Sequence, residues 1–186
     1  MKYLQEFRVF ENRSPLLELS NNADVELIYK IRGLISNGSI LEISCGNGAD
    51  AIELSKLGFN VTATDNCDDY IKYVNSNGVK CIKHDTKERF PFKNNSFDLV
   101  YSRLGLHYFS VDELKNIFDE ISRISKKYLV FTVKLVNDIP TGKVIFNEDT
   151  WRDLVSDKFE ILESSVKEGI LYNNQSKWLE IIAKKK

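Results

Sequence analysis

The stretch that decides the fold reads ILEISCGNGADAIELSKLGFNVTATD, from Ile40 to Asp65. The branched apolar residues at its start are typical of a buried parallel strand. Gly46 and Gly48 then allow a turn with positive φ that a ligand can approach closely. A helix that ends at Gly58 and a second branched strand that ends at Asp65 complete a β–α–β unit. This unit has the layout of a nucleotide-binding site.

Charge separates the two cofactor classes that use this layout. Residues 46–51 satisfy the dinucleotide fingerprint G-x-G-x-x-G/A, and Asp65 follows as its acid. A dinucleotide places an anionic pyrophosphate at the helix N-terminus, where carboxylates are unfavourable. Here Glu42, Asp50 and Asp65 surround the loop, and residues 33–55 contain no lysine or arginine. S-adenosylmethionine has no phosphate and carries sulfonium and ammonium cations, so the charge pattern favours it over a dinucleotide.

These residues also resemble a known family. Residues 42–48 are similar to motif I, acid-x-Gly-x-Gly-x-Gly, of class I S-adenosylmethionine-dependent methyltransferases. Residues 90–100, FPFKNNSFDLV, resemble the segment leading into strand four in the type 11 and tellurite-resistance-like groups of small-molecule methyltransferases, and so do residues 106–109, LHYF. The likeness covers roughly residues 25–186. Ser44 stands at the first motif glycine, and a serine fits this turn if its φ is negative.

Strands and helices alternate along the rest of the chain, which predicts an α/β fold with a mainly parallel sheet and helices on both faces. The resemblance implies a single doubly wound domain whose seven strands have the order 3-2-1-4-5-7-6, with strand seven antiparallel. Beyond the β–α–β unit, helices are predicted at 23–35, 68–77, 111–124 and 147–155, and strands at 79–83, 97–102, 128–135, 159–166 and 177–183.

Ligands of such sheets bind beyond the carboxyl ends of the strands, where the strand order reverses. Asp65 is predicted to accept hydrogen bonds from both ribose hydroxyls. The resemblance implies that Asp85, with Thr86 beside it, contacts the adenine amino group. Glu42, inside a buried strand, either binds backbone donors of the loop or steers the methionine ammonium. The predicted cofactor-binding residues are Glu42, Ser44, Cys45, Gly46, Asn47, Gly48, Asp65, Asn66, Asp85, Thr86, Ser102, Arg103 and Leu104.

Two candidate catalytic residues follow strand four. In similar enzymes the segment with His107 overhangs the transferred methyl group, so His107 is a candidate general base or substrate orienter, with a structural histidine as the alternative. Tyr108 shares that neighbourhood. A thiolate or oxyanion acceptor needs no base, whereas an amine or hydroxyl does, and the sequence leaves the acceptor open. The histidines, cysteines and acids lack metal-ligand spacing, so no metal site is predicted.

Bulk properties set the remaining expectations. The 186 residues predict one domain, 23–186, after an arm at 1–22 that either packs on it or covers the site as an aromatic lid. A net charge of −1 gives no overall attraction to nucleic acid or anionic membrane. Without a signal peptide or an apolar run long enough to span a bilayer, the cytoplasm is expected, with a monomer or weak homodimer.

The predicted function is S-adenosylmethionine-dependent methyl transfer to a small-molecule substrate. Two alternatives stay open: a nicotinamide-dependent oxidoreductase, and a methyltransferase-like protein that binds the cofactor without activity.

Overall fold

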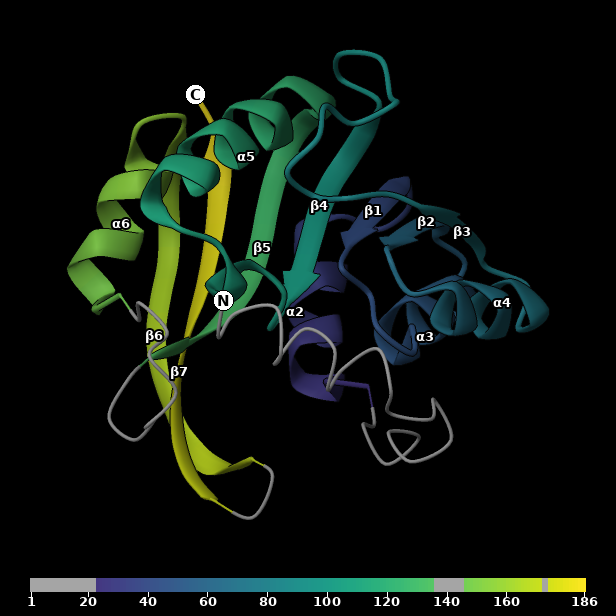
Figure 1. The fold of residues 1–186 in the computed structure, drawn as a ribbon, viewed down its shortest axis with the longest axis horizontal. Coiled ribbons are helices and arrows are strands. Elements are labelled where there is room, and N and C mark those ends of the chain that lie inside the picture. The colour runs from purple at the N-terminus through teal and green to yellow at the C-terminus, as the bar shows by residue number, and fades with distance from the viewer. Residues whose placement is uncertain (1–22, 136–145, 172–173) are drawn as a thin grey trace, which may run out of the picture.

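The computed structural model describes residues 23–135, 146–171 and 174–186, so the predicted arm at 1–22 lies outside the described residues (Figure 1). The described chain forms a seven-stranded sheet with the order β3-β2-β1-β4-β5-β7-β6. β7 pairs antiparallel with β5 and β6, while the pairs from β3 to β5 are parallel. The predicted fold class and strand order are confirmed. The strands are β1 (Ser39–Ile43), β2 (Asn60–Asp65), β3 (Lys80–Lys83), β4 (Phe97–Arg103), β5 (Ser125–Leu135), β6 (Phe159–Leu171) and β7 (Asn174–Lys185).

Helices cover both faces of the sheet (Figure 1). They are α2 (Val25–Leu34), α3 (Ala49–Lys56), α4 (Asp68–Ser76), α5 (Val111–Ile124), α6 (Glu148–Ser156) and the short 3₁₀ helix η2 (Leu106–Tyr108). The start of α5 follows from a capping box, in which the Ser110 hydroxyl accepts from the Glu113 N–H and the Glu113 carboxylate accepts from the Ser110 N–H. α3 ends before Gly58, whose φ of +93° fits the predicted left-handed C′ position.

Two hydrophobic cores lie on the two faces. Beneath α5 and α6, Phe118, Phe131 and Trp151 pack together and are at most 1% exposed. Beneath α2 and α3, Leu27 and Leu54 pack on the opposite face. The two layers hold the strands from both sides, so the carboxyl ends of the parallel strands are fixed relative to one another.

β6 and β7 are longer than predicted. The apolar pattern places β6 at 159–166 and β7 at 177–183, but backbone pairing continues to Leu171 and Asn174. In Figure 1 this hairpin extends past the rest of the sheet. Charged residues such as Lys167 and Glu168 interrupt the apolar alternation, so hydropathy alone does not reveal the extension.

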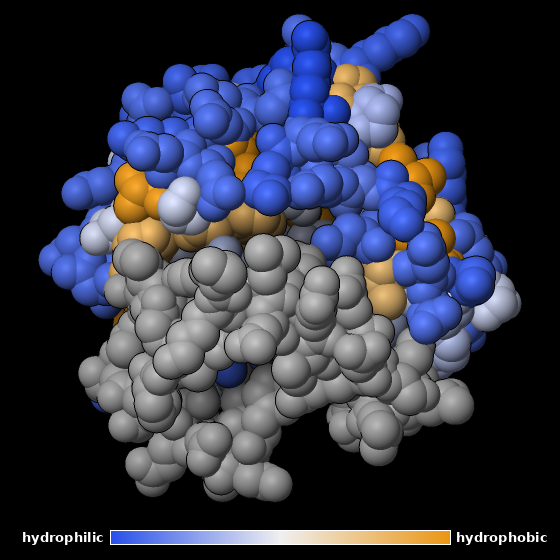
Figure 2. All heavy atoms as spheres, in the orientation of Figure 1, coloured by the Kyte–Doolittle hydropathy of each residue, from blue (hydrophilic) through white to orange (hydrophobic). Residues whose placement is uncertain are grey.

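The face in Figure 2 is mostly hydrophilic over the described residues, with small separate hydrophobic patches. None of the helices in the described part of the chain has the length and apolar character needed to cross a membrane. The expected location and oligomeric state stay predictions.

Candidate functional site

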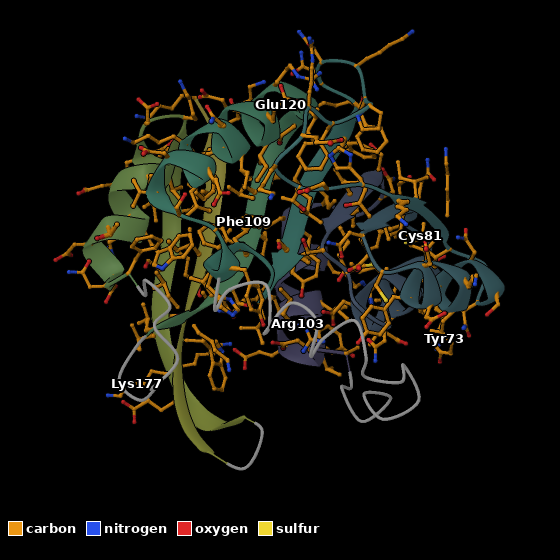
Figure 3. The ribbon with its side chains drawn as sticks, in the orientation of Figure 1. Tyr73, Cys81, Arg103, Phe109, Glu120 and Lys177 are labelled. Atoms are coloured by element: carbon orange, nitrogen blue, oxygen red, sulfur yellow. The ribbon has the colours of Figure 1, made fainter. Side chains whose placement is uncertain are left out.

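Four loops meet at one edge of the sheet, where the parallel strands β1 to β4 end. The N–H of Cys45, after β1, donates to the carbonyl of Thr64 in β2 at 3.0 Å. The Ser102 hydroxyl in β4 donates to the carbonyl of Ile43 in β1 at 3.1 Å. Figure 3 shows Arg103 at this end of β4, with Phe109 in the segment that follows. The structure therefore brings the predicted site residues together at the place where the strand order reverses.

The two glycines of the loop face different surroundings. Both have positive φ, +56° at Gly46 and +68° at Gly48. A Cβ on Gly46 would meet nothing within 4 Å, whereas one on Gly48 would lie 2.4 Å from a methyl of Val74 in α4. Gly46 thus presents its backbone to open space, and the missing side chain of Gly48 makes room for α4. Of the two, Gly46 is the one that a ligand can approach closely.

Asp65 at the end of β2 closes the loop onto its neighbour strand. One carboxylate oxygen accepts from the Gly46 N–H at 2.8 Å, and the other accepts from the Cys67 N–H at 2.9 Å. Its side chain is half-buried. Asp65 therefore holds the glycine loop in place, and its contact with the ribose hydroxyls stays a prediction.

Glu42 is a buried carboxyl group within β1. It is 2% exposed, and its Oε2 has no hydrogen-bond partner among the described residues. Burial and the nearby Asp50 carboxylate raise the pKa of Glu42 well above its usual value, although Arg103 and a hydrogen bond with the Ala51 backbone oppose this. Ala51 lies in α3 and not in the loop, so both predicted roles of Glu42, the contact with loop donors and the steering of the methionine ammonium, stay predictions.

Asp50 joins three elements behind the loop. Its carboxylate accepts from the Asp24 N–H at 2.7 Å and from the Tyr101 hydroxyl at 3.0 Å, and it pairs with the Arg103 guanidinium. Arg103 thus fixes β4 against α3, and its predicted cofactor contact is not tested. Sequence reasoning missed Tyr101, although a tyrosine inside an apolar strand signals a buried hydroxyl that needs a partner.

Ser44 has an unusual backbone conformation in the loop. Its φ is +55°, in the left-handed region, so the negative φ that would let a serine fit this turn easily is not present. Leu104, at the end of β4, has a φ of +57°. Both residues carry a Cβ, which makes this backbone conformation unfavourable. Such strain tends to occur at functional sites, and here two strained residues lie at adjacent strand ends.

The ends of β2, β3 and β4 supply both exposed and buried groups. Asp85 is half-buried and accepts from the Lys87 N–H at 2.9 Å, while Asn66 is exposed. Thr86 and Ser102 are buried, and Ser102 is fully enclosed. These two side chains connect strand ends, and the prediction that they also contact the cofactor stays untested.

The candidate catalytic residues lie in η2, between β4 and α5. The rings of His107 and Tyr108 are 4.3 Å apart between centroids, and both side chains are half-buried. By contrast, His84 packs on Phe90 at 4.5 Å, and burial lowers the pKa of His84. Among the described residues, no group of three or more metal-ligating side chains is present.

Comparisons with known proteins agree with this geometry. Residues 40–128 match the family model described as a methyltransferase domain. Malonyl-[acyl-carrier protein] O-methyltransferase from Buchnera aphidicola is 29% identical over 139 residues, which are 74% of this chain and 49% of that protein. The chain thus spans about half the length of this curated relative.

Solved structures show the same fold. TehB from Haemophilus influenzae superimposes with a TM-score of 0.78 at 19% identity, over 91% of this chain and 65% of that chain. A SAM-dependent methyltransferase from Methanosarcina mazei gives a TM-score of 0.74 at 22% identity, over 88% and 98%. The resemblance to class I methyltransferases is confirmed, and S-adenosylmethionine is the cofactor that the family match supports.

Proposed function

We propose that this chain is an enzyme that transfers the methyl group of S-adenosylmethionine to a small-molecule acceptor. Its match to a methyltransferase-domain model and its fold, shared with a SAM-dependent methyltransferase, support this. The loop geometry carries the proposal: Gly46 faces open space, and Asp65 holds its N–H from the neighbouring strand. The loop has no basic side chain to hold a pyrophosphate. This supports a cationic cofactor over a dinucleotide.

The bound cofactor supplies a methyl group that is already activated. The protein then contributes alignment of the acceptor and exclusion of water. Asp65 and Gly46 fix the loop on the cofactor side, while η2 places His107 and Tyr108 on the segment that follows β4. The loop follows β1 and η2 follows β4, and these two strands are neighbours in the sheet. Cofactor and acceptor would therefore meet at the ends of β1 and β4.

We favour an acceptor whose attacking atom is already an anion. The name of the Buchnera relative gives a malonyl group and transfer to oxygen, and a carboxylate oxygen is an anion before it reaches an enzyme. Such an acceptor needs no general base. If His107 is instead the base for an amine or hydroxyl, His107→Ala would lower turnover by about 10²–10⁴-fold and remove a limb of the pH–rate profile near pH 6.5. With an anionic acceptor, the loss is about tenfold and the limb stays.

A thermal-shift comparison of S-adenosylhomocysteine, NAD and NADP tests the cofactor class. A ligand that binds only the native state at 100 times its Kd adds about 2.7 kcal/mol of stability, which gives a clear rise in Tm. We expect this rise with S-adenosylhomocysteine alone. Gly46→Asn serves as the matched control, because asparagine tolerates a positive φ and its side chain would fill the open space and abolish the shift. Stabilisation by NAD without any response to S-adenosylhomocysteine would overturn the proposal.

Cofactor binding without transfer to any acceptor would instead identify a protein that has lost activity. Incubation with S-adenosylmethionine and a panel of carboxylates, thiols, amines and hydroxyl compounds separates these outcomes. The accumulation of S-adenosylhomocysteine measures transfer to any of them.

A further inference from the structure

Ser44 lies where three strand ends meet. Its hydroxyl is 3.1 Å from the hydroxyl of Thr86, in hydrogen-bond contact, and Thr86 follows β3. On its other side, a Cβ built on Gly105 would lie 2.7 Å from the Cβ of Ser44. Gly105 is the residue before η2, so it leads directly to His107. One serine side chain therefore bonds to the segment after β3 and leaves no room for a side chain on the segment after β4.

The backbone at Ser44 is unfavourable for any residue with a Cβ, since its φ is +55°. A glycine would adopt this conformation without strain, and the motif that residues 42–48 resemble has glycine there. Strain of this kind persists only where the surrounding structure enforces it. The Thr86 hydroxyl and the close approach of Gly105 are the contacts that a glycine would lose.

Gly105 shows the reciprocal adaptation. Its φ is −97°, so its backbone does not require glycine. An added Cβ would meet the Ser44 Cβ at 2.7 Å and the Ser102 hydroxyl at 3.0 Å, and the Ser102 hydroxyl is itself bonded to Ile43. The absence of a side chain at Gly105 thus matches the presence of one at Ser44.

We propose that Ser44 is a positioning residue whose side chain sets the segments 85–86 and 104–108 against the cofactor loop. This rests on the proposed function, in which these segments face the adenine and the acceptor. Ser44 need not touch either ligand, because it acts through Thr86 and Gly105. The contacts of the Ser44 side chain therefore offset the unfavourable backbone conformation at this residue.

The contact with Gly105 is tested without any ligand. Gly105→Ala should lower Tm by several degrees, because two neighbours would have to shift. In a Ser44→Gly background the same substitution should lower Tm by less than half as much, since the closest atom is gone. An equal fall in Tm in the wild-type and Ser44→Gly backgrounds would show that Ser44 does not contact residue 105.

The hydrogen bond to Thr86 is tested by calorimetric titration with S-adenosylhomocysteine. Ser44→Ala keeps the Cβ and removes only the hydroxyl, and we expect Kd to rise about 3–10-fold while Tm changes by less than two degrees. Thr86→Val should raise Kd at least as much, and the double variant should be no weaker than Thr86→Val alone. A fall in Tm with unchanged Kd would assign Ser44 a purely structural role and overturn the proposal.

Failure of the two proposals looks different. If the wild-type protein shows no binding heat, the proposed function fails, and the positioning role fails with it. If the wild-type protein binds and Ser44→Ala binds equally well, the function stands and only the role of Ser44 is lost. Ser44→Cys is the conservative variant, since its unbranched side chain keeps a weak donor and should restore part of the affinity relative to Ser44→Ala.

Discussion

The two halves of the sheet are held together by different means. In the half formed by β3, β2 and β1, the strands have 4 to 6 residues, and side chains such as Asp65 bind backbone N–H groups at their ends. In the half formed by β5, β7 and β6, the strands have 11 to 13 residues. There, ion pairs between side chains connect the sheet to α2.

The ion pairs centre on Glu180 of β7, which is completely buried. Its carboxylate lies 2.6 Å from the Lys30 ammonium of α2 and 2.9 Å from the Lys167 ammonium of β6. Lys30 also pairs with Glu163, and Lys167 pairs with Glu26. Burial alone would lower the pKa of Lys30, but the carboxylates of Glu163 and Glu180 outweigh burial and raise that pKa.

This difference separates ligand binding from scaffolding. The short-strand half fixes backbone groups around the loop, so changes there should alter cofactor affinity. The long-strand half fixes α2 against the hairpin, so changes there should alter stability and leave affinity unchanged. Each of the following substitutions tests one side of this division.

The largest effect is expected for Glu180→Gln. Without the Glu180 charge, Lys30 and Lys167 keep only their partly exposed partners Glu163 and Glu26, and breaking a buried ion pair costs up to about 3–5 kcal/mol. Urea denaturation should show this loss, while the Kd of S-adenosylhomocysteine at low temperature stays the same. Glu163→Gln is the control, since its side chain is 46% exposed and an exposed pair contributes about 1 kcal/mol or less. Equal losses in the two variants would show that burial does not decide the strength of this cluster.

Asp65→Ala should lower cofactor affinity and not stability. Charged hydrogen bonds to the ribose and the bond that holds Gly46 are both lost, so binding should weaken by about 2–4 kcal/mol. Calorimetric titration measures this change. Asp68→Ala is the control, because Asp68 pairs with Lys83 on the surface of the same half. An unchanged Kd for Asp65→Ala would place the ribose elsewhere.

Glu42→Gln tests the buried carboxyl of β1. Its raised pKa means that the native state keeps the proton above the pH at which the unfolded chain releases it, near 4.3. Wild-type stability should therefore fall as pH rises from the unfolded pKa toward the folded pKa, by about 1.4 kcal/mol for each unit of elevation. The glutamine variant lacks this titration, so its advantage over the wild type should grow with pH in chemical denaturation.

The sequence predicted the short-strand half more completely than the long-strand half. Gly46 and Asp65 act through backbone geometry at fixed spacing, which a linear pattern reveals. The contacts of Glu180 join residues 150 and 13 positions apart, and no local pattern indicates them. The same applies to the pairing of Ser44 with Gly105, because a linear pattern cannot show the contacts that enforce a positive φ at Ser44.

The smallest effect is expected for Asp98→Asn, at the boundary between the halves. Asp98, the second residue of β4, accepts from the N–H and hydroxyl of Ser39 in β1, at 2.8 and 2.7 Å, at the edge opposite the site. Burial alone would raise the pKa of Asp98, but the bonds from Ser39 and the Lys126 ammonium lower it to about 2. Gly38 allows this approach, since a Cβ there would lie 2.7 Å from the carboxylate.

A depressed folded pKa stabilises the native state above the unfolded pKa, near 3.9, and this contribution is lost as pH falls toward 2. Because about a third of the side chain is exposed, solvent screening limits the effect to about 1 kcal/mol. Asp98→Asn should therefore be less stable than the wild type at pH 6 and lose that difference by pH 2.5. The Kd of S-adenosylhomocysteine should not change in Asp98→Asn, because Asp98 connects the two halves at the edge farthest from the loop. A weaker Kd in Asp98→Asn would mean that the two edges of the sheet are coupled and that binding and scaffolding are not separate.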